Sequence, residues 1–153
     1  YETSAITRYI DEAFDGPALQ PAEIRARVEM NKWISAANHY YDRVLVRDLV
    51  IQRLVVPSQG GTPDEAMIAG AVEKLPRLLD ILDAHLADRS YLAGDAVSLA
   101  DLFMQPMIAS MLMTGEGKAA MAGRGHIERW FEAMAARPSV AALAPKPEAS
   151  AAE

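Results

Sequence analysis

The chain has 153 residues, a formal net charge of −6 at pH 7 and no cysteine. Its length suits one domain that buries about 70% of its unfolded surface, and the missing thiols exclude disulfides and thiolate metal sites. The acidic balance and the scattered basic residues disfavour a nucleic-acid partner, and no apolar run approaches the roughly 20 residues that span a bilayer. We therefore expect a soluble, cytoplasmic protein that has no nucleic-acid or membrane partner.

Helical spacing of apolar residues dominates the N-terminal part of the chain. It predicts a first helix over residues 4–14, which the glycine and the two prolines of DGPALQP then end. The spacing next predicts one long helix over residues 22–56, closed by the segment PSQGGTP.

A second start signal follows this break. Thr62 is expected as the N-cap, Pro63 as the first helical residue and Glu65 as the partner that closes a capping box. The helix should run to about residue 88. Pro76 predicts a bend inside it, because proline removes one backbone hydrogen bond.

The stretch YLAGDAVSLADLF contains a complete helix-start signal. Ser98 is expected as the N-cap, with the Asp101 carboxylate reaching back to its N–H in a capping box. The flanking Val97 and Leu102 have the spacing of a hydrophobic staple. The segment that follows is too apolar for a surface helix, which predicts a buried central helix.

The rest of the chain continues the helical pattern. Residues 115–125 look like a flexible glycine-rich connection, residues 126–137 like a short helix stopped by Pro138, and residues 139–145 like a last turn or two. Nothing alternates with period two for long enough to form a strand. The predicted fold class is therefore an all-α helical bundle.

Motifs that carry chemistry are mostly missing. The three histidines, His39, His85 and His126, lie far apart without the spacing of metal ligands, so no metal site is expected. The segment TGEGKAA lacks the glycine and the Ser/Thr of a phosphate-binding loop. Methionines at helical spacing in the central helix indicate core, although methionine also lines adaptable apolar pockets.

The order of several segments resembles a family. These segments are YETSAITRYID, a proline-containing linker, a tryptophan-bearing helix with HYYD, then TPDEA, KLPRLLDILDAHLADRSYLAGDAVSLADL and RWFEAMAARPS. In this order they resemble a glutathione transferase, and most of all its phi-type branch of plants and bacteria. The resemblance implies a glutathione transferase C-terminal-like bundle, in which the S-x-x-D box caps the central helix. It divides the chain into the last helix of a truncated thioredoxin-like domain (1–15), a linker (16–21), the all-α C-terminal domain (22–144) and a disordered tail (145–153).

The resemblance also implies an activity, the conjugation of a glutathione thiolate to an apolar electrophile in detoxification. Glutathione would be a co-substrate, and no cofactor is expected. Glu2 and Thr3 match the family's Glu-Ser pair, which holds the γ-glutamyl end of glutathione, although Thr3 could instead only cap the first helix. No catalytic residue can be assigned, because the group that activates the thiol lies upstream in the family. The chain alone is therefore expected to be inactive.

By position in the resemblance, the candidates for the electrophile wall are His39, Arg43, Met107 and Met111. His39 could equally be a packing or solvent-facing residue. A homodimer of the full-length protein is implied, through the helix that holds Arg8 and two long helices that meet a neighbour's first domain. The alternative function is a non-catalytic, transferase-like interaction module of protein assemblies, and the retained Glu2 favours the enzyme.

Overall fold

The computed structural model describes residues 1–143, and within this range every regular element is a helix. One isolated bridge joins Tyr91 to Gly94, and no strand forms in the described part of the chain. The predicted all-α class is therefore confirmed. No helix in this range is long and apolar enough to cross a membrane. The tail predicted over 145–153, together with residue 144, lies outside the described residues.

The first helix, α1 (Thr3–Ala13), forms where the spacing predicts it. The linker after it turns back along α1, because the Asp11 carboxylate accepts hydrogen bonds from the backbone N–H groups of Leu19 (2.7 Å) and Gln20 (3.1 Å). The Leu19 carbonyl in turn accepts from the N–H of Leu99, at 3.0 Å. A segment without regular structure thus ties α1 to the central helix.

The predicted long helix is continuous but has three sections. They are α2 (Ile24–Ala36), the π-helix η1 (Ala37–Val55) and the short α3 (Val56–Ser58). The Glu23 carboxylate caps its start by accepting from the N–H of Ala26 at 2.7 Å. The spacing of apolar residues therefore predicts the extent of the helix, but it does not predict that the middle section is a π-helix.

Two ion pairs fit the wide winding of η1. Arg47 Nε donates to Asp42 at 2.6 Å, and Arg43 Nε lies 2.9 Å from Asp48 Oδ1, so both pairs join residues five positions apart. A π-helix bonds i to i+5, which brings such residues to the same side, whereas an α-helix pairs i with i+3 or i+4. The two ion pairs of η1 thus join residues with the same five-residue spacing as the backbone hydrogen bonds of a π-helix.

Helix α4 (Glu65–His85) begins later than predicted. Asp64, not Thr62, is the N-cap, and its carboxylate accepts from the N–H of Met67 at 2.9 Å. Glu65 does not close a capping box but forms an ion pair with Arg53 of η1, at 2.6 Å. The expected start is wrong because Asp64 places a stronger acceptor nearer the helix than the threonine hydroxyl does. Pro76 lies inside α4, which continues through it.

Helix α5 (Leu99–Met111) is the central helix, and Ser98 and Asp101 form a capping box at its start. Asp101 is completely buried and is the acceptor for four donors. Its Oδ2 accepts from Ser98 N (2.9 Å) and Ser98 Oγ (2.8 Å), and its Oδ1 accepts from Leu92 N (2.9 Å) and Trp130 Nε1 (2.8 Å). One carboxylate therefore joins α5 to the loop before it and to a tryptophan 29 residues away.

The segment predicted as a flexible connection forms a helix instead, α6 (Gly115–Met121). The Thr114 hydroxyl caps it by accepting from the N–H of Gly117 at 3.0 Å. Gly117 is buried, and a Cβ on it would lie 2.1 Å from the carbonyl oxygen of Met111. Glycine is therefore needed here for close packing and not for flexibility.

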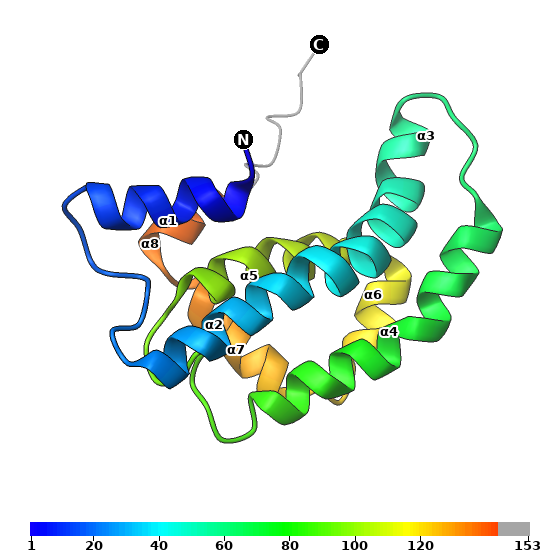
Figure 1. Cartoon of the computed structure of the whole chain (residues 1–153). Helices are drawn as coiled ribbons and strands as arrows, with labels where there is room; N and C mark the ends of the chain where they lie inside the picture. Colours follow the sequence, from blue (N-terminus) through cyan, green and yellow to red (C-terminus); the bar gives the residue numbers. More distant parts are fainter. Residues whose placement is uncertain (144–153) are drawn as a thin grey trace, which may run out of the picture.

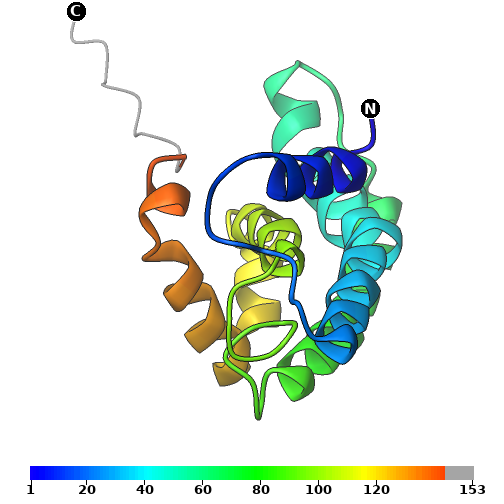
Figure 2. The same ribbon diagram turned by 60° about the vertical axis from the view of Figure 1, so that its left-hand side comes forward.

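The last helices are α7 (Gly125–Ala135) and α8 (Pro138–Ala141). Asp83 of α4 caps α7 from a distance, since its Oδ1 accepts from the N–H groups of His126 and Ile127 at 3.0 Å each. Figures 1 and 2 show α5 inside the bundle, with α1 across one side and the C-terminal end of α4 on the opposite side. The core gathers large side chains from all the main helices except α1, among them Met30, Leu45, Leu49, Leu75, Leu79, Leu82, Met104, Ile108 and Trp130.

Candidate functional site

Glu2 and Thr3 lie at the N-terminal end of α1, and both are exposed. Glu2 has a φ of 70°, and it is the one non-glycine residue with positive φ in the described part of the chain. An L-residue in this region carries about 1–3 kcal/mol of strain, and such strain clusters at functional sites. The backbone thus marks the predicted glutathione-binding pair.

The start of α1 carries no side-chain cap. Thr3 is the first residue of the helix rather than its N-cap, so the alternative in which Thr3 only caps α1 does not match this geometry. The N–H groups of a first helical turn have no partners within the helix, and the helix dipole makes them attractive to an anion. This end of α1 is therefore chemically suited to a carboxylate ligand.

One face of α1 is apolar and has no cover within residues 1–143. None of its residues is buried, and the large side chains of this face are between 47% and 66% exposed: Ile6, Tyr9, Ile10 and, just beyond the helix, Phe14. Contiguous exposed apolar patches mark interaction sites in soluble proteins.

The structure brings two of the predicted electrophile-wall residues together. His39 and Arg43 lie on η1 and line a pocket of about 410 Å³ between η1 and α4. His39 Nδ1 is 2.8 Å from the carbonyl oxygen of Ser35, and Arg43 is held by Asp48, which is almost fully buried.

The other two candidates lie elsewhere. Met107 is on α5, partly buried against the core, and Met111 is completely buried one turn later. Neither contributes to the pocket of His39 and Arg43. In this arrangement Met111 could only support a wall formed by other side chains.

A larger pocket, of about 820 Å³, adjoins the first and was not predicted. It lies between α2 and α4, and Tyr40, Arg77 and Leu78 line both pockets. We call the two together the α2–α4 groove. Its apolar and aromatic surface is formed by Trp33, Ala36, Tyr40, Tyr41, Leu78, Ile81, Ala84 and His85. The spacing of these residues on two helices is visible in the sequence, but an open groove and a closed helix seam have the same pattern.

Polar groups of the groove are set by burial. The Tyr41 hydroxyl donates to the carbonyl of Leu78 at 2.8 Å, and burial raises the pKa of this phenol well above its usual range. The His85 ring packs against Trp33 at a tilt of 47°, with 4.6 Å between ring centroids, and Lys32 Nζ lies 5.8 Å from the centroid of the Trp33 ring. The pKa of His85 is lowered, and burial of the ring is the main cause. The Trp33 indole N–H is buried without a hydrogen-bond partner among the described residues.

The predicted glutathione residues and the groove lie on different sides of the bundle. Figures 1 and 2 both show the N-terminal end of α1 on the side opposite the C-terminal end of α4, where Trp33 meets His85. A conjugation reaction needs its two substrates in contact. The larger pocket of the groove is therefore not beside Glu2 and Thr3. Among residues 1–143, no group of three or more His, Asp or Glu residues could hold a metal ion.

Comparison with known proteins identifies the family. Residues 45–138 match the family model of the glutathione S-transferase C-terminal domain. The chain is 38% identical to glutathione S-transferase 3 of Zea mays over 161 residues, which cover 99% of the chain and 71% of the relative. This chain belongs to the glutathione S-transferase family. It is also 35% identical to glutathione S-transferase F10 of Arabidopsis thaliana, over 90% of the chain and 64% of that relative.

Solved structures agree with this assignment. A glutathione S-transferase III in apo form superposes with a TM-score of 0.84 at 35% identity, over 96% of this chain and 69% of that one. Glutathione transferase F7 from Populus trichocarpa gives a TM-score of 0.82 at 32% identity, over 93% of the chain and 67% of that structure. The predicted phi-type resemblance and fold are confirmed. The chain thus spans 71% of the maize relative and between 64% and 65% of the Arabidopsis relatives F9 and F10. These comparisons give no support to the alternative of a non-catalytic interaction module.

Proposed function

We propose that this chain forms the C-terminal, electrophile-side part of an enzyme that conjugates glutathione to apolar electrophiles. The observation that carries the proposal is the geometry of Glu2, a strained residue directly before an uncapped helix, at the position of the family's glutathione-binding pair. The Glu2 carboxylate would pair with the γ-glutamyl amine. The Thr3 hydroxyl and the first-turn N–H groups of α1 would hold the γ-glutamyl carboxylate.

The exposed face of α1 supports a partner domain. Ile6, Tyr9, Ile10 and Phe14 form an apolar stripe that a thioredoxin-like domain would bury. In this proposal residues 1–15 are the last helix of that domain and 16–21 the linker. The all-α domain begins at residue 22.

The reaction joins the glutathione sulfur to an electrophilic carbon while a leaving group departs with its electron pair. The group that lowers the pKa of the thiol belongs to the partner domain, so the chain alone is inactive. His39, Arg43 and Met107 remain our candidates for contact with the electrophile, with Met111 behind Met107. We place the reaction in the cytoplasm, as a step of detoxification that needs no cofactor besides its co-substrate.

We further propose a homodimer in which the larger pocket of the α2–α4 groove, where Trp33 meets His85, packs against the first domain of a second copy. The floor of this pocket is apolar, and Lys32 and Arg77 lie at its edge. Arg8 of α1 donates to Asn31 of α2, so α1 is tied to the helix that lines the groove.

A chimera tests the proposal. The first domain of the maize transferase is joined ahead of Tyr1, and conjugation of glutathione to 1-chloro-2,4-dinitrobenzene is measured by absorbance. We expect activity for the chimera and none above background for the 153-residue chain. Retention on immobilised glutathione should follow the same order.

The variant Glu2→Gln in the chimera should raise the KM for glutathione about tenfold or more, because a charge-assisted contact is lost. Glu12→Gln, a change of the same chemistry at the far end of α1, is the control and should leave the KM unchanged. A folded chimera without activity, or equal KM values for the two variants, would refute the proposal.

A further inference from the structure

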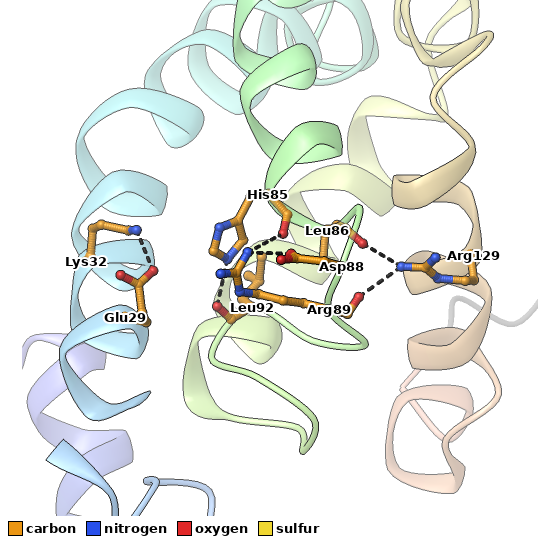
Figure 3. Close-up of polar contacts among 8 residues, drawn as sticks. All are labelled: Glu29, Lys32, His85, Leu86, Asp88, Arg89, Leu92 and Arg129. Carbon is orange, nitrogen blue, oxygen red and sulfur yellow. Dashed lines mark hydrogen bonds and ion pairs between the residues drawn. The ribbon is translucent and has the colours of Figure 1, made fainter. Parts of the chain in front are cut away.

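His85 joins three segments of the molecule in the floor of the α2–α4 groove. It is the last residue of α4, its ring packs at a tilt against Trp33 of α2, and its Nε2 lies 2.9 Å from the carbonyl oxygen of Leu92 in the loop before α5. Figure 3 shows the imidazole between α2 and this loop. Leu92 continues the connection, since its N–H donates to Asp101 at 2.9 Å.

The hydrogen bond fixes which nitrogen of His85 titrates. A carbonyl oxygen only accepts, so Nε2 carries the proton of the neutral ring and Nδ1 is the basic atom. His85 is half-buried and lines the larger pocket, so Nδ1 can exchange protons with solvent through the groove. Protonation keeps the bond to Leu92 and adds a positive charge to the groove floor.

The charged groups around His85 oppose that added charge. Arg89 of the loop donates to the backbone carbonyl of His85 at 3.0 Å, and Lys32 of α2 lies over the Trp33 ring. On the acidic side, Glu29 is already paired with Lys32, and Asp88 is paired with Arg89 at 2.7 Å (Figure 3). Each anion already has a cationic partner, so the additional imidazolium would have to share Glu29 with Lys32.

Burial is the main cause that lowers the pKa of His85, with Arg89 and Lys32 adding to it against the hydrogen bond to Leu92. The unfolded chain therefore binds this proton at higher pH than the folded chain does. The stabilising contribution is fully present above the unfolded value of 6.5 and is lost as the pH falls through the lower folded value. At neutral pH the groove floor is consequently uncharged.

We propose that His85 is a proton switch in the α2–α4 groove: its protonation turns an apolar floor into a cationic one and releases the second copy that covers it. This inference rests on the dimer of the proposed function. The imidazolium would also place a second cation beside Trp33, whose ring Lys32 already approaches to 5.8 Å. Covering the groove with an apolar surface would remove the remaining water from Nδ1 and oppose protonation further.

The first experiment uses the chain itself. The ring protons of the three histidines are titrated by NMR between pH 8 and pH 4.5, and the Trp33 indole N–H is followed in the same samples. We expect the pKa of His85 to lie below the ordinary histidine value, with the Trp33 signal shifting at the His85 midpoint. His85→Gln keeps a donor for Leu92 but cannot titrate, and should abolish the Trp33 shift. The control His39→Gln, in the adjoining pocket, should preserve it.

The second experiment measures dimerisation of the chimera by sedimentation velocity at pH 7.5 and pH 5.5. The dissociation constant should rise about threefold or more on acidification, because the open groove binds the His85 proton more tightly than the covered groove does. In His85→Gln the rise should disappear, whereas the control His126→Gln, on α7 and outside both pockets, should behave as the wild type does.

The outcomes separate the two proposals. A chimera that is monomeric at both pH values refutes the proposed dimer, whatever the histidine titration shows. A dimer whose acid sensitivity survives in His85→Gln refutes the switch and leaves the dimer intact. A Trp33 signal with equal pH dependence in the wild type and in His85→Gln also refutes the switch.

Discussion

The start of α5 and the start of α1 show two opposite ways of building a helix terminus. At α5, the Asp101 carboxylate is completely buried and accepts four hydrogen bonds, all from within this chain. At α1, the terminus has no side-chain cap and Glu2 is strained, and no residue of the helix is buried. The cap of α5 is thus supplied by the chain itself, whereas residues 1–143 supply no side-chain cap to α1.

This difference separates folding residues from binding residues. A fully satisfied buried carboxylate stabilises one arrangement of the loop, α5 and α7, and it has no free acceptor for a ligand. An uncapped helix start and an uncovered apolar face contribute little to the stability of the chain, but both are available to a substrate and to a partner domain. Substitutions at the start of α5 should therefore lower the stability of the chain. Substitutions on α1 should instead lower binding and leave the stability almost unchanged.

The largest effect is expected for Asp101→Ala. It leaves four buried donors without an acceptor, so the free energy of unfolding should fall by about 3 kcal/mol or more. Urea denaturation of the chain, followed by circular dichroism, measures this loss. The control Asp88→Ala removes an exposed carboxylate that pairs only with Arg89, and should change the free energy by less than about 0.5 kcal/mol. Similar losses for the two variants would show that the buried Asp101 carboxylate contributes no more to stability than an exposed carboxylate does.

An intermediate effect is expected for Gly117→Ala. The new Cβ would meet the Met111 carbonyl at 2.1 Å, so α6 must shift, at a cost of about 1–3 kcal/mol. Gly115→Ala places its Cβ in open space at the start of the same helix. This control should be neutral or stabilise by up to about 1 kcal/mol. If thermal unfolding ranked the two variants in the reverse order, the close packing of α6 on Met111 would be wrong.

The smallest effect on stability is expected on α1. Replacing Ile6 and Ile10 together by serine should change the free energy of unfolding of the chain by less than about 0.5 kcal/mol, because both side chains are about half exposed. The same double change should abolish glutathione retention by the chimera. Ile34→Ser, in the buried face of α2, should instead cost the chain about 3 kcal/mol. A large loss of stability from the α1 change would show that α1 belongs to the core.

The sequence by itself determined the local features that depend on near neighbours. The helical period predicts α1, the full length of the long helix, α5 and α7. The three-residue spacing of Ser98 and Asp101 predicts their capping box, since both partners lie in one turn. The ordered segments from YETSAITRYID to RWFEAMAARPS carried the family resemblance. The same resemblance predicted Glu2 and Thr3 as glutathione-binding residues, and the strained φ of Glu2 is a physical observation that supports this prediction.

Only the tertiary structure decided the features whose partners are distant in the chain. From the sequence, Gly117 is predicted to be flexible, and only its close contact with Met111 shows that it is needed for packing. Asp83 caps a helix that begins more than 40 residues later. The α2–α4 groove exists because two apolar helix faces diverge, which no pattern along one helix reveals. Local signals act through the backbone of one turn, whereas burial, distant caps and open surfaces depend on which helices pack together.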